Sequence, residues 1–446
     1  MDYRQAKEYI QKIQSGAKIK PGLETTAELL KHLGDPQDKL RFVHIAGTNG
    51  KGSTASFISS ILAEAGYKVG RYVSPAVCSE LETIQWMQDR KAVYIAEKEM
   101  ADILTEVIEA VKEMRAAGWG TPTEFEIGTA AAFLAFVRQN TDIVVLETGM
   151  GGRLDSTNVV KTTDCAVITP VAMDHMKFLG NTLEEIAGEK AGIIKEHVPA
   201  VTCQKKEGVQ RILSGVCLEK EAELYTVKRE KIQIKRTSLK GSLFEYGEYG
   251  ELSIALPGLY QVENACLALE CINILKEKYP VSKEQIRNGL AGAAWPGRFE
   301  VIRQNPLVVV DGAHNMDGMK CFLESVRMYF GTGRKIGIMG VFADKEHKAM
   351  AALLTGIFDK VYTVTPGSER GLPAKELAKE LEACQIHAVD CQSFKEAAQY
   401  AIRDSSDGDC PVFVFGSLSL IKEAYRNIRI RDAGKEKEND HEPGNL

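Results

Sequence analysis

The sequence lacks the patterns that mark several classes of protein. Its ten cysteines include no Cys-x-x-Cys pair, which argues against a zinc ribbon or a thioredoxin-like dithiol. No stretch approaches the roughly 18 uninterrupted apolar residues of a membrane span, and the polar N-terminus (MDYRQ) lacks the apolar core of a signal peptide. No internal repeat of solenoid period is present. We therefore expect a cytoplasmic protein with reduced thiols.

An excess of charge of either sign is also missing. The chain has 56 basic and 61 acidic residues, which gives a net charge of −5, and it has no long run of Lys and Arg. Because broad attraction to nucleic acid or to an anionic membrane needs an excess of basic charge, we expect neither as a partner. The hydrophobic fraction of 44% and the charged fraction of 26% exclude a disordered, collagen-like or coiled-coil chain. A length of 446 residues suggests two or three domains.

Apolar runs of strand length alternate with amphipathic helical segments, and this pattern predicts an α/β fold with a parallel sheet covered by helices. Between about 225 and 256 the rhythm changes to period-two alternation with glycine turns, which predicts a small antiparallel sheet. The strands expected before this region are 42–46, 142–146 and 165–169, and the expected helices are 53–65, 262–277 and 283–291.

A second domain is predicted after residues 295–297 (WPG), because Pro and Gly both interrupt regular structure. The alternation restarts there, with strands expected at 307–310, 336–339, 361–364 and 412–415. We therefore expect domains at 1–296 and 297–430, the second of them doubly wound and Rossmann-like. Residues 431–446 are charged and contain Gly and Pro, so we expect a disordered tail.

The strongest local signal is residues 47–54 (GTNGKGST), which lie between an expected buried strand and an expected helix. Glycines let the backbone curl so that its N–H groups point at phosphate oxygens, and the helix adds the positive end of its dipole. Lys51 is expected to reach the β- and γ-phosphates, and Ser53 or Thr54 to bind Mg²⁺. The strict Walker pattern is not met, because Gly52 stands where Ser or Thr is expected and Ile replaces the first glycine. A glycine turn with a solvated lysine is the alternative; we favour a P-loop ATPase domain.

Three side chains near this loop in the predicted fold could take part in its chemistry. Glu147 ends an apolar strand, where a metal-binding acid belongs. The glycines after it do not complete a dinucleotide fingerprint, because Leu154 stands in place of the third. His175 could ligate a metal or orient a group, although a structural histidine is the alternative. Lys190 lies among small and apolar neighbours, and from these residues alone the favoured interpretation is a side chain whose head reaches solvent.

Asp311 and His314 follow an apolar strand of the second domain. The carboxyl end of such a strand is the edge that carries ligands, so both residues are candidates for contact with nucleotide or substrate. An Asx-type turn that caps the next helix is the alternative.

Taken in order, these residues resemble a known family. The chain is similar to folylpolyglutamate synthase and its bifunctional relative dihydrofolate synthase, within the Mur ligase superfamily. The resemblance covers about residues 1–425 in collinear order. The motifs that carry it are 44–53 (HIAGTNGKGS), 125–126 (FE), 146–158 (LETGMGGRLDSTN), 174–175 (DH), 189–195 (EKAGIIK), 264–265 (NA), 296–298 (PGR), 311–315 (DGAHN) and 416–418 (GSL).

The resemblance implies an ATP-dependent ligase, with a Mur-ligase-type ATP-binding domain at 1–296 and a glutamate-ligase domain at 297–430. ATP would phosphorylate the carboxylate of a folate, or of dihydropteroate, to an acyl phosphate. The amine of L-glutamate would then form the amide, and ADP and phosphate would be released. Mg²⁺ and cationic side chains are needed because two anions must meet. The likeness makes a monomer the expected state.

The resemblance also implies the nucleotide and metal sites. ATP would be held by Thr48, Asn49, Gly50, Lys51, Gly52, Ser53, Asn264, Arg298 and Asp311. One Mg²⁺ would be bound by Ser53, Ser74 and Glu147, and a second by Glu147, His175 and a carbamylated Lys190. Carbamylation adds CO₂ to the lysine and turns a cation into a ligand for the metal. A monovalent cation is an optional further cofactor.

The resemblance implies catalytic and substrate-binding residues as well. The catalytic group would comprise Lys51, Lys190, His175, Arg298 and His314. The pterin site would be formed by Thr123, Glu124, Phe125, Glu126, Arg153, Leu154, Asp155 and Ser156. Ser417, together with His314, would lie at the glutamate pocket.

The chain departs from the family pattern at Ala76, Thr83 and Ser419, where the family has His, Arg and Tyr. The first two departures fall in a segment expected near the pterin, so the acid substrate stays open. One alternative is another Mur-type ligase with a different acid. A peptidoglycan ligase is disfavoured, because the phosphate loop begins by residue 47 and leaves no room for a separate N-terminal nucleotide-sugar domain. The other alternative is a regulatory ATPase that binds ATP and ligates nothing.

Overall fold

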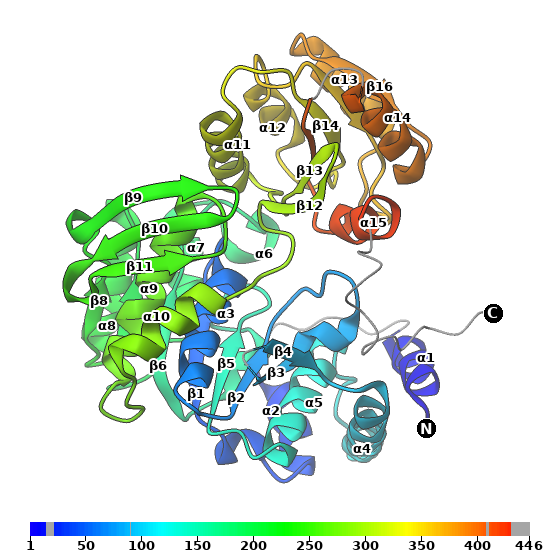
Figure 1. Cartoon of the computed structure of the whole chain (residues 1–446). Coiled ribbons are helices and arrows are strands. Elements are labelled where there is room, and N and C mark those ends of the chain that lie inside the picture. The colour runs from blue at the N-terminus through cyan, green and yellow to red at the C-terminus, as the bar shows by residue number, and fades with distance from the viewer. Residues whose placement is uncertain (15–21, 90, 407–409, 430–446) are drawn as a thin grey trace. The chain divides into compact units, whose positions relative to one another are not determined.

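The described chain forms two compact units (Figure 1). The structure is a computed structural model that describes residues 1–14, 22–89, 91–406 and 410–429. The first unit comprises Met1–Pro296 with Asn315–Ser325, and the second comprises Gly297–His314 and the chain from Val326. The tail expected at 431–446 lies outside the described residues.

The first unit is built on a mostly parallel sheet. Its strands are β1 (Phe42–Ala46), β2 (Val69–Tyr72), β3 (Ile84–Gln88), β4 (Lys91–Tyr94), β5 (Ile143–Glu147), β6 (Thr163–Ile168), β7 (Ala200–Thr202) and β8 (Leu224–Thr226). They are ordered β4-β3-β2-β5-β1-β6-β7-β8; β3 pairs in antiparallel fashion with both β2 and β4, and all the other pairs are parallel. The three expected strands correspond to β1, β5 and β6, whose residues are almost all buried, as in strands covered on both faces.

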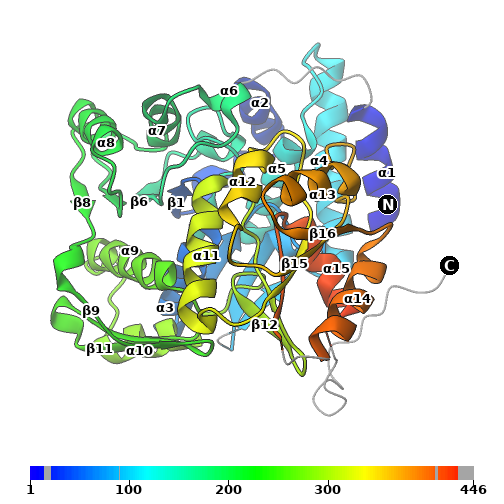
Figure 2. The same cartoon turned by 90° about the horizontal axis from the view of Figure 1, so that it is seen from above.

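Helices cover both faces of this sheet (Figure 2). They are α1 (Tyr3–Gln14), α2 (Glu24–His32), α3 (Lys51–Glu64), α4 (Glu97–Ala116), α5 (Glu124–Arg138), α6 (Met176–Leu179), α7 (Leu183–Ala191), α8 (Glu207–Glu219), α9 (Leu259–Leu275) and α10 (Lys283–Gly292). Because side chains alternate along a strand, Val43 and Ile45 of β1 join a core with α3, α9 and α10. Phe42 faces the opposite core, with α4 and α5. None of the helices in the described ranges combines the length and apolarity needed to cross a membrane.

The region of period-two alternation forms the small antiparallel sheet that was predicted. Its strands are β9 (Ile232–Ser238), β10 (Gly241–Tyr246) and β11 (Glu251–Ile254), in the order β11-β10-β9. Phe244, Leu252 and Ile254 pack into the core shared with α9 and α10. The start of the region differs from the prediction, because β8 pairs in parallel with β7 and extends the main sheet.

The second unit holds a sheet in the order β12-β13-β17-β14-β15-β16, in which only β12 is antiparallel to its neighbour. The strands are β12 (Glu300–Gln304), β13 (Leu307–Val310), β14 (Ile336–Met339), β15 (Lys360–Thr363), β16 (His387–Asp390) and β17 (Val412–Phe415). The helices of this unit are α12 (His347–Leu353), α13 (Ala374–Ala383), α14 (Phe394–Ser406) and α15 (Ser419–Asn427). Helix α11 (Met316–Phe330) is divided, because its residues 316–325 belong to the first unit. The predicted α/β class is confirmed for both units.

Candidate active site

The turn between β1 and α3 presents backbone N–H groups suited to an anion. The Thr54 N–H donates to the Gly50 carbonyl (2.9 Å), which makes the first turn of the helix. The N–H groups of Lys51, Gly52 and Ser53 precede that bond and have no acceptor within the helix. Gly50 takes a φ of 88°, a value that glycine adopts without a steric penalty. The predicted phosphate loop therefore has the local geometry of an anion site.

The backbone of Thr48 and Asn49 ties this loop to the segment after β6. Both N–H groups donate to the Pro170 carbonyl, at 2.9 and 3.3 Å. The Thr48 hydroxyl lies 3.2 Å from the Ala172 carbonyl and accepts the Ala172 N–H at 3.0 Å. These bonds fix the loop at the carboxyl edge of the sheet, where ligands of open α/β sheets bind.

Two lysine heads converge on one carbonyl oxygen of the loop. Lys190 Nζ donates to the Gly47 carbonyl at 2.8 Å, and Lys51 Nζ donates to the same oxygen at 3.3 Å. Lys51 Nζ also lies 3.7 Å from Glu147 Oε1. Burial, together with repulsion from Lys51, lowers the pKa of Lys190 to about 7. The ammonium groups of Lys51 and Lys190 and the buried carboxylate of Glu147 thus lie close together at the start of α3.

The oxygen groups at this edge fit the preference of Mg²⁺. Glu147 is the last residue of β5, and only 6% of its side chain is exposed. The Ser74 hydroxyl is buried and has no hydrogen-bond partner, a state that costs free energy unless a further ligand satisfies it. Within the described ranges no three His, Cys, Asp or Glu side chains form a metal cluster. The two predicted ions therefore depend on hydroxyls and on Lys190 for part of their ligand sets.

His175 lies at the surface beside a buried carboxylate. It takes a φ of 50° just before α6, and 39% of its side chain is exposed. Its N–H donates to Asp174 Oδ1 at 2.9 Å, and its ring Nε2 lies 4.0 Å from the same oxygen. The turn directs the imidazole outward, where it can contact a ligand.

Helix α9 brings Asn264 to the phosphate loop. A Cβ atom on Gly50 would lie 2.6 Å from Asn264 Oδ1, so the two residues are in close contact. Asn264 Nδ2 donates to Gln261 Oε1 at 3.0 Å, and Gln261 Nε2 donates to the Ser53 hydroxyl at 3.2 Å. This chain of amides links the predicted nucleotide residue Asn264 to Ser53, the predicted Mg²⁺ ligand.

The predicted pterin residues at the start of α5 serve first as a helix cap. Glu126 N–H donates to the Thr123 hydroxyl (3.2 Å), and the Glu126 carboxylate accepts the Thr123 N–H (2.7 Å), which is a capping box. Glu126 also accepts the Thr26 hydroxyl at 2.9 Å. Glu124 is exposed. The ring of Phe125 lies 6.1 Å from that of Tyr72. Glu124 and the ring of Phe125 are therefore the side chains of this group outside the cap.

The loop after β5 is held by its own polar residues. Asp155 accepts the Met150 N–H at 2.8 Å and the Thr157 N–H and hydroxyl at 3.1 and 2.6 Å. Burial raises the pKa of the Asp155 carboxyl. The Ser156 hydroxyl lies 3.0 Å from that of Thr129. Asp155 and Ser156 thus shape the loop, whereas the side chain of Leu154 is 41% exposed.

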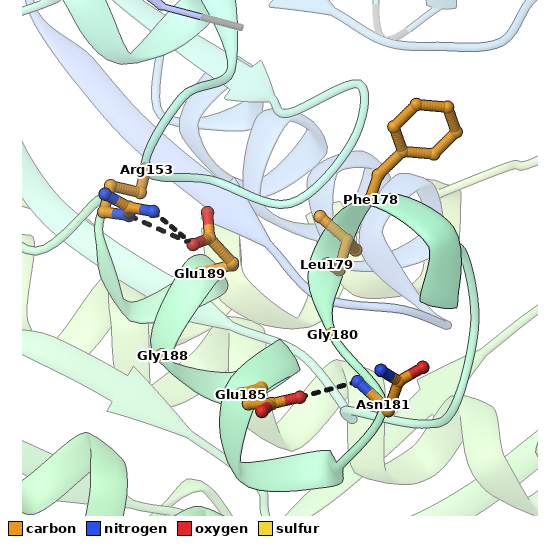
Figure 3. Close-up of a pocket in the computed structure, with 8 residues that line it drawn as sticks. All are labelled: Arg153, Phe178, Leu179, Gly180, Asn181, Glu185, Gly188 and Glu189. Atoms are coloured by element: carbon orange, nitrogen blue, oxygen red, sulfur yellow. Dashed lines mark hydrogen bonds and ion pairs between the residues drawn. The ribbon is translucent and has the colours of Figure 1, made fainter.

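A pocket of about 540 Å³ opens beside Arg153 (Figure 3). It is lined by Arg153, Phe178, Leu179, Gly180, Asn181, Glu185, Gly188 and Glu189. Arg153 donates through Nη2 and Nε to Glu189 Oε1, at 2.6 and 3.1 Å. Figure 3 shows this ion pair on one side and the Phe178 ring turned away on the other. Phe178 is 67% exposed. Arg153 is the one predicted site residue among those that line the pocket.

In the second unit, Asp311 organises the loop after β13. Its two oxygens accept the Phe299 and Ala313 N–H groups, each at 2.8 Å. Arg298 Nη1 donates to the Gly297 carbonyl at 3.0 Å and packs on Gly312, where a Cβ atom would lie 2.4 Å away.

Two further predicted residues of the second unit also have local partners. The His314 ring bonds the Gly312 carbonyl through Nδ1 (2.7 Å), so Nδ1 carries the proton and Nε2 is the distal nitrogen. Ser417 is buried, and its hydroxyl lies 2.9 Å from that of Ser419. Ser419, one of the departures from the family pattern, is therefore a neighbour of the predicted glutamate-pocket residue.

Comparison with known proteins identifies the family of this chain. Residues 45–272 match the Mur ligase middle domain, and residues 297–418 match the glutamate ligase domain of Mur ligases. A dihydrofolate synthase/folylpolyglutamate synthase of Bacillus subtilis is 34% identical over 92% of this chain and 96% of its own length. A folylpolyglutamate synthase of Lacticaseibacillus casei is 34% identical over 88% and 91%. The chain belongs to the folylpolyglutamate synthase family of Mur ligases.

The solved structures agree with this family membership. A Mycobacterium tuberculosis folylpolyglutamate synthase complexed with ADP matches with a TM-score of 0.87 and 28% identity, over 97% of this chain and all of the other. The predicted resemblance and the predicted ATP-dependent ligase activity are thereby confirmed at the level of the family.

Two polar residues near the predicted phosphate loop were not predicted. Gln261 bridges Asn264 and Ser53, and Arg71 is buried and donates to the Ser59 hydroxyl of α3. A signal for Gln261 exists in the sequence, since it is a polar residue three positions before Asn264, on the same side of a helix that is mostly apolar (LYQVENACLALE). Arg71 shows no such signal, because it stands in a strand (VGRY) whose pattern does not reveal that all four residues are buried.

Proposed function

We propose that this protein joins L-glutamate to the carboxylate of a folate, a tetrahydropteroyl-(poly)glutamate, and that dihydropteroate is a second acid substrate. ATP phosphorylates the acid, the amine of glutamate attacks the acyl phosphate, and ADP and phosphate leave. The observation that carries the proposal is the convergence of Lys51 and Lys190 on the Gly47 carbonyl beside buried Glu147. The names of the relatives from B. subtilis and L. casei supply the substrate class.

The phosphate loop holds the triphosphate in this proposal. The N–H groups of Gly50 to Ser53 bind phosphate oxygens, and Lys51 neutralises charge that develops during phosphoryl transfer. Asn264 contributes to the nucleotide site from α9, a role supported by its contact with Gly50.

Two Mg²⁺ ions complete the nucleotide site. Ser53, Ser74 and Glu147 would hold one ion, and Glu147, His175 and a carbamylated Lys190 would hold the other. When bound, Mg²⁺ screens the phosphate charge against the approaching carboxylate. Carbamylation is supported by the electrostatics of the site, because two ammonium groups share one buried carbonyl. Replacing one positive head by a carboxylate-like group turns their repulsion into attraction.

The second unit supplies further groups to the reaction. Arg298 and Asp311 contact ATP, and Arg298 and His314 act near the transferred phosphoryl. Ser417, with His314, binds L-glutamate. These roles are supported by the position of all four residues in loops at the carboxyl ends of β13 and β17 or, for Arg298, in contact with such a loop.

The acid substrate is placed along two segments of the first unit. Thr123–Glu126 at the start of α5 and residues 153–156 after β5 form the pterin site. Phe125 supports this placement, because its ring lies 2.5 Å from the position of a Cβ atom on Gly149 and so joins the two segments. Arg153 and Leu154 offer the exposed side chains of the second segment.

An assay of ADP release tests the proposal. The protein is given ATP, Mg²⁺ and L-glutamate, with dihydropteroate and tetrahydrofolate offered separately, and the product mass is measured. A gain of one glutamyl unit on both acids is the expected result, and a gain on tetrahydrofolate alone would limit the protein to polyglutamate synthesis. If neither acid stimulates ADP release although ATP binds, the folate assignment is wrong, and Ala76 and Thr83 mark the segment that would select another acid. A regulatory ATPase would hydrolyse ATP independently of both acids and of glutamate.

A further inference from the structure

The indole of Trp295 fills the space beside Gly52 of the phosphate loop. A methyl group at Gly52 would lie 2.4, 2.5 and 2.7 Å from Cζ2, Cε2 and Nε1 of that ring, well inside the normal contact distance of about 3.5–4.0 Å. Gly52 is the second residue of α3, and its N–H is one of three that the helix leaves for an anion. The ring therefore lies directly against the backbone that is to hold phosphate.

A buried arginine holds the Trp295 ring in place. Arg71 Cζ lies 5.1 Å from the centre of the ring, and the residue is 2% exposed. Its Nε donates to Gln85 Oε1 at 2.8 Å and its Nη1 to the Ser59 hydroxyl at 3.1 Å. Burial lowers the pKa of Arg71 to about 10, so the guanidinium is charged at neutral pH. Cation–π contacts are strongest when, as here, the cation is removed from water.

One face of helix α3 packs against Arg71 and Trp295. Gly52, Ser56 and Ser59 are spaced four and three residues apart, so they share one face of the helix. The Ser56 hydroxyl donates to the Ala294 carbonyl at 2.7 Å, which fastens the main chain next to Trp295. Ser59 binds Arg71 on the same face. The position of the ring is thus fixed by three contacts: with Gly52 at the start of α3, through the Ser56–Ala294 hydrogen bond in the middle of the helix, and with Arg71 of β2.

We propose that Trp295, held by Arg71, is a positioning residue for the phosphate loop and requires glycine at position 52. The inference rests on the proposed role of this loop in holding the triphosphate. It explains one of the two departures from the strict Walker pattern: a Ser or Thr at position 52 would collide with the ring. The hydroxyl that serves Mg²⁺ then belongs to Ser53, one residue later.

A double-mutant cycle on ATP binding tests the coupling between the two residues. Gly52→Ala should weaken binding of a non-hydrolysable ATP analogue with Mg²⁺ at least tenfold (about 1.4 kcal/mol), because ring and loop can no longer both keep their positions. Trp295→Ala should raise the KM for ATP more than it lowers kcat at saturating ATP. In the double variant the alanine at position 52 should cause little further loss, because the ring is gone. Equal losses from Gly52→Ala in both backgrounds would overturn the proposal.

Matched control variants distinguish a specific effect on the phosphate loop from a nonspecific effect of losing a tryptophan. Trp119→Ala removes a tryptophan that is 42% exposed and lies in the loop after α4, so the Kd for the analogue should not change. Lys51→Ala tests the proposed function itself. If Lys51→Ala leaves the Kd unchanged, the loop is not the ATP site. If Lys51→Ala abolishes binding while residues 52 and 295 act independently, the loop assignment stands and only the positioning role fails.

A spectroscopic measurement keeps the proposal testable should Gly52→Ala not fold. The chain has three tryptophans, and the variant Trp86→Phe/Trp119→Phe leaves Trp295 as its single indole fluorophore. The ATP analogue with Mg²⁺ should change the emission of Trp295 with the same Kd that calorimetry gives. Arg71→Met should reduce this change, because the ring is no longer clamped. An emission that stays constant through saturation contradicts the contact between the occupied loop and the ring.

Discussion

Replacing Lys190 by Met removes a buried ammonium group, and the resulting change in stability should depend on pH. Lys190 has a pKa of about 7 in the folded chain, against 10.5 for an ordinary lysine. At 1.36 kcal/mol per pKa unit, the charged form is disfavoured by up to about 5 kcal/mol on folding.

The direction of the effect follows from proton binding. Between pH 7 and 10.5 the unfolded chain holds a proton on Lys190 that the folded chain has released, so the free energy of unfolding rises with pH. The penalty is therefore complete below pH 7 and absent above pH 10.5. From pH 7 to 9.5 the wild-type protein should gain about 3 kcal/mol relative to Lys190→Met, and at pH 7 or below the variant should be the more stable of the two.

Urea unfolding followed by tryptophan fluorescence measures this difference. All three tryptophans lie in the first unit, so their emission reports the unit that contains Lys190. Buffers free of CO₂ keep the amine unmodified. Lys276→Met, at an exposed site after α9, serves as the control and should change with pH as the wild type does. If the wild-type protein and Lys190→Met show the same pH dependence, the pKa of Lys190 is not depressed and the electrostatic argument for its carbamylation fails.

Four further substitutions test individual groups. Lys51→Ala should abolish ADP release, since it removes the cation 3.7 Å from Glu147; a wild-type kcat would exclude it from phosphoryl transfer. Glu147→Gln keeps the shape but removes the charge, so activity at saturating ATP should be lost and should need far more Mg²⁺ to recover; an unchanged Mg²⁺ titration rejects the ligand role. Thr123→Ala removes the cap of α5 and its bond with Glu126, and should lower the free energy of unfolding by about 1 kcal/mol; an unchanged urea midpoint would show that the cap is not needed. Asp311→Ala leaves two backbone N–H groups without their acceptor, at about 1–3 kcal/mol each, and should speed amide exchange in that loop; unaltered exchange would contradict this.

The parts of the fold that the sequence predicts are those governed by continuous apolar runs. β1 and β5 lie within one residue of the expected ranges, because nearly continuous apolar runs are typical of strands buried on both faces of a parallel sheet. β8 was not recognised as part of that sheet. It has three residues, Leu224–Thr226, none of them fully buried, and so short a strand carries no periodic signal. Its pairing with β7 is decided by tertiary contact.

The candidate site was predictable where a local motif fixes the backbone. The glycines and Lys51 of the phosphate loop predict a turn and a helix start, and both are present. The contact of Arg71 with Trp295 beside that loop was not predictable, because the two residues are 224 positions apart, and neither the strand VGRY nor the sequence WPG at the domain boundary indicates the other. Gly52 did carry a hint, since a glycine in place of Ser or Thr indicates that something occupies the space of its side chain. The identity of that neighbour requires the three-dimensional structure.

Several predicted site residues also stabilise the local backbone, and any activity measurement on their variants must take this structural role into account. Glu126, Asp155 and Asp311 all accept backbone N–H groups, and each fixes a turn next to the proposed substrate or nucleotide site. Truncating such a carboxylate leaves buried donors unsatisfied, so activity would fall whether or not the carboxylate touches a ligand. Glu147 differs, because its 3.7 Å ion pair with Lys51 does not close a turn of the backbone. Lys51 makes that ion pair and also donates to the Gly47 carbonyl of its own loop, so the stability of a Lys51 variant must be measured beside its activity. A loss of activity with unchanged stability would therefore assign a direct role in the reaction to Lys51 and Glu147. For Glu126, Asp155 and Asp311, ligand affinity must instead be measured in a variant whose loop stays intact, such as Asp→Asn or Glu→Gln.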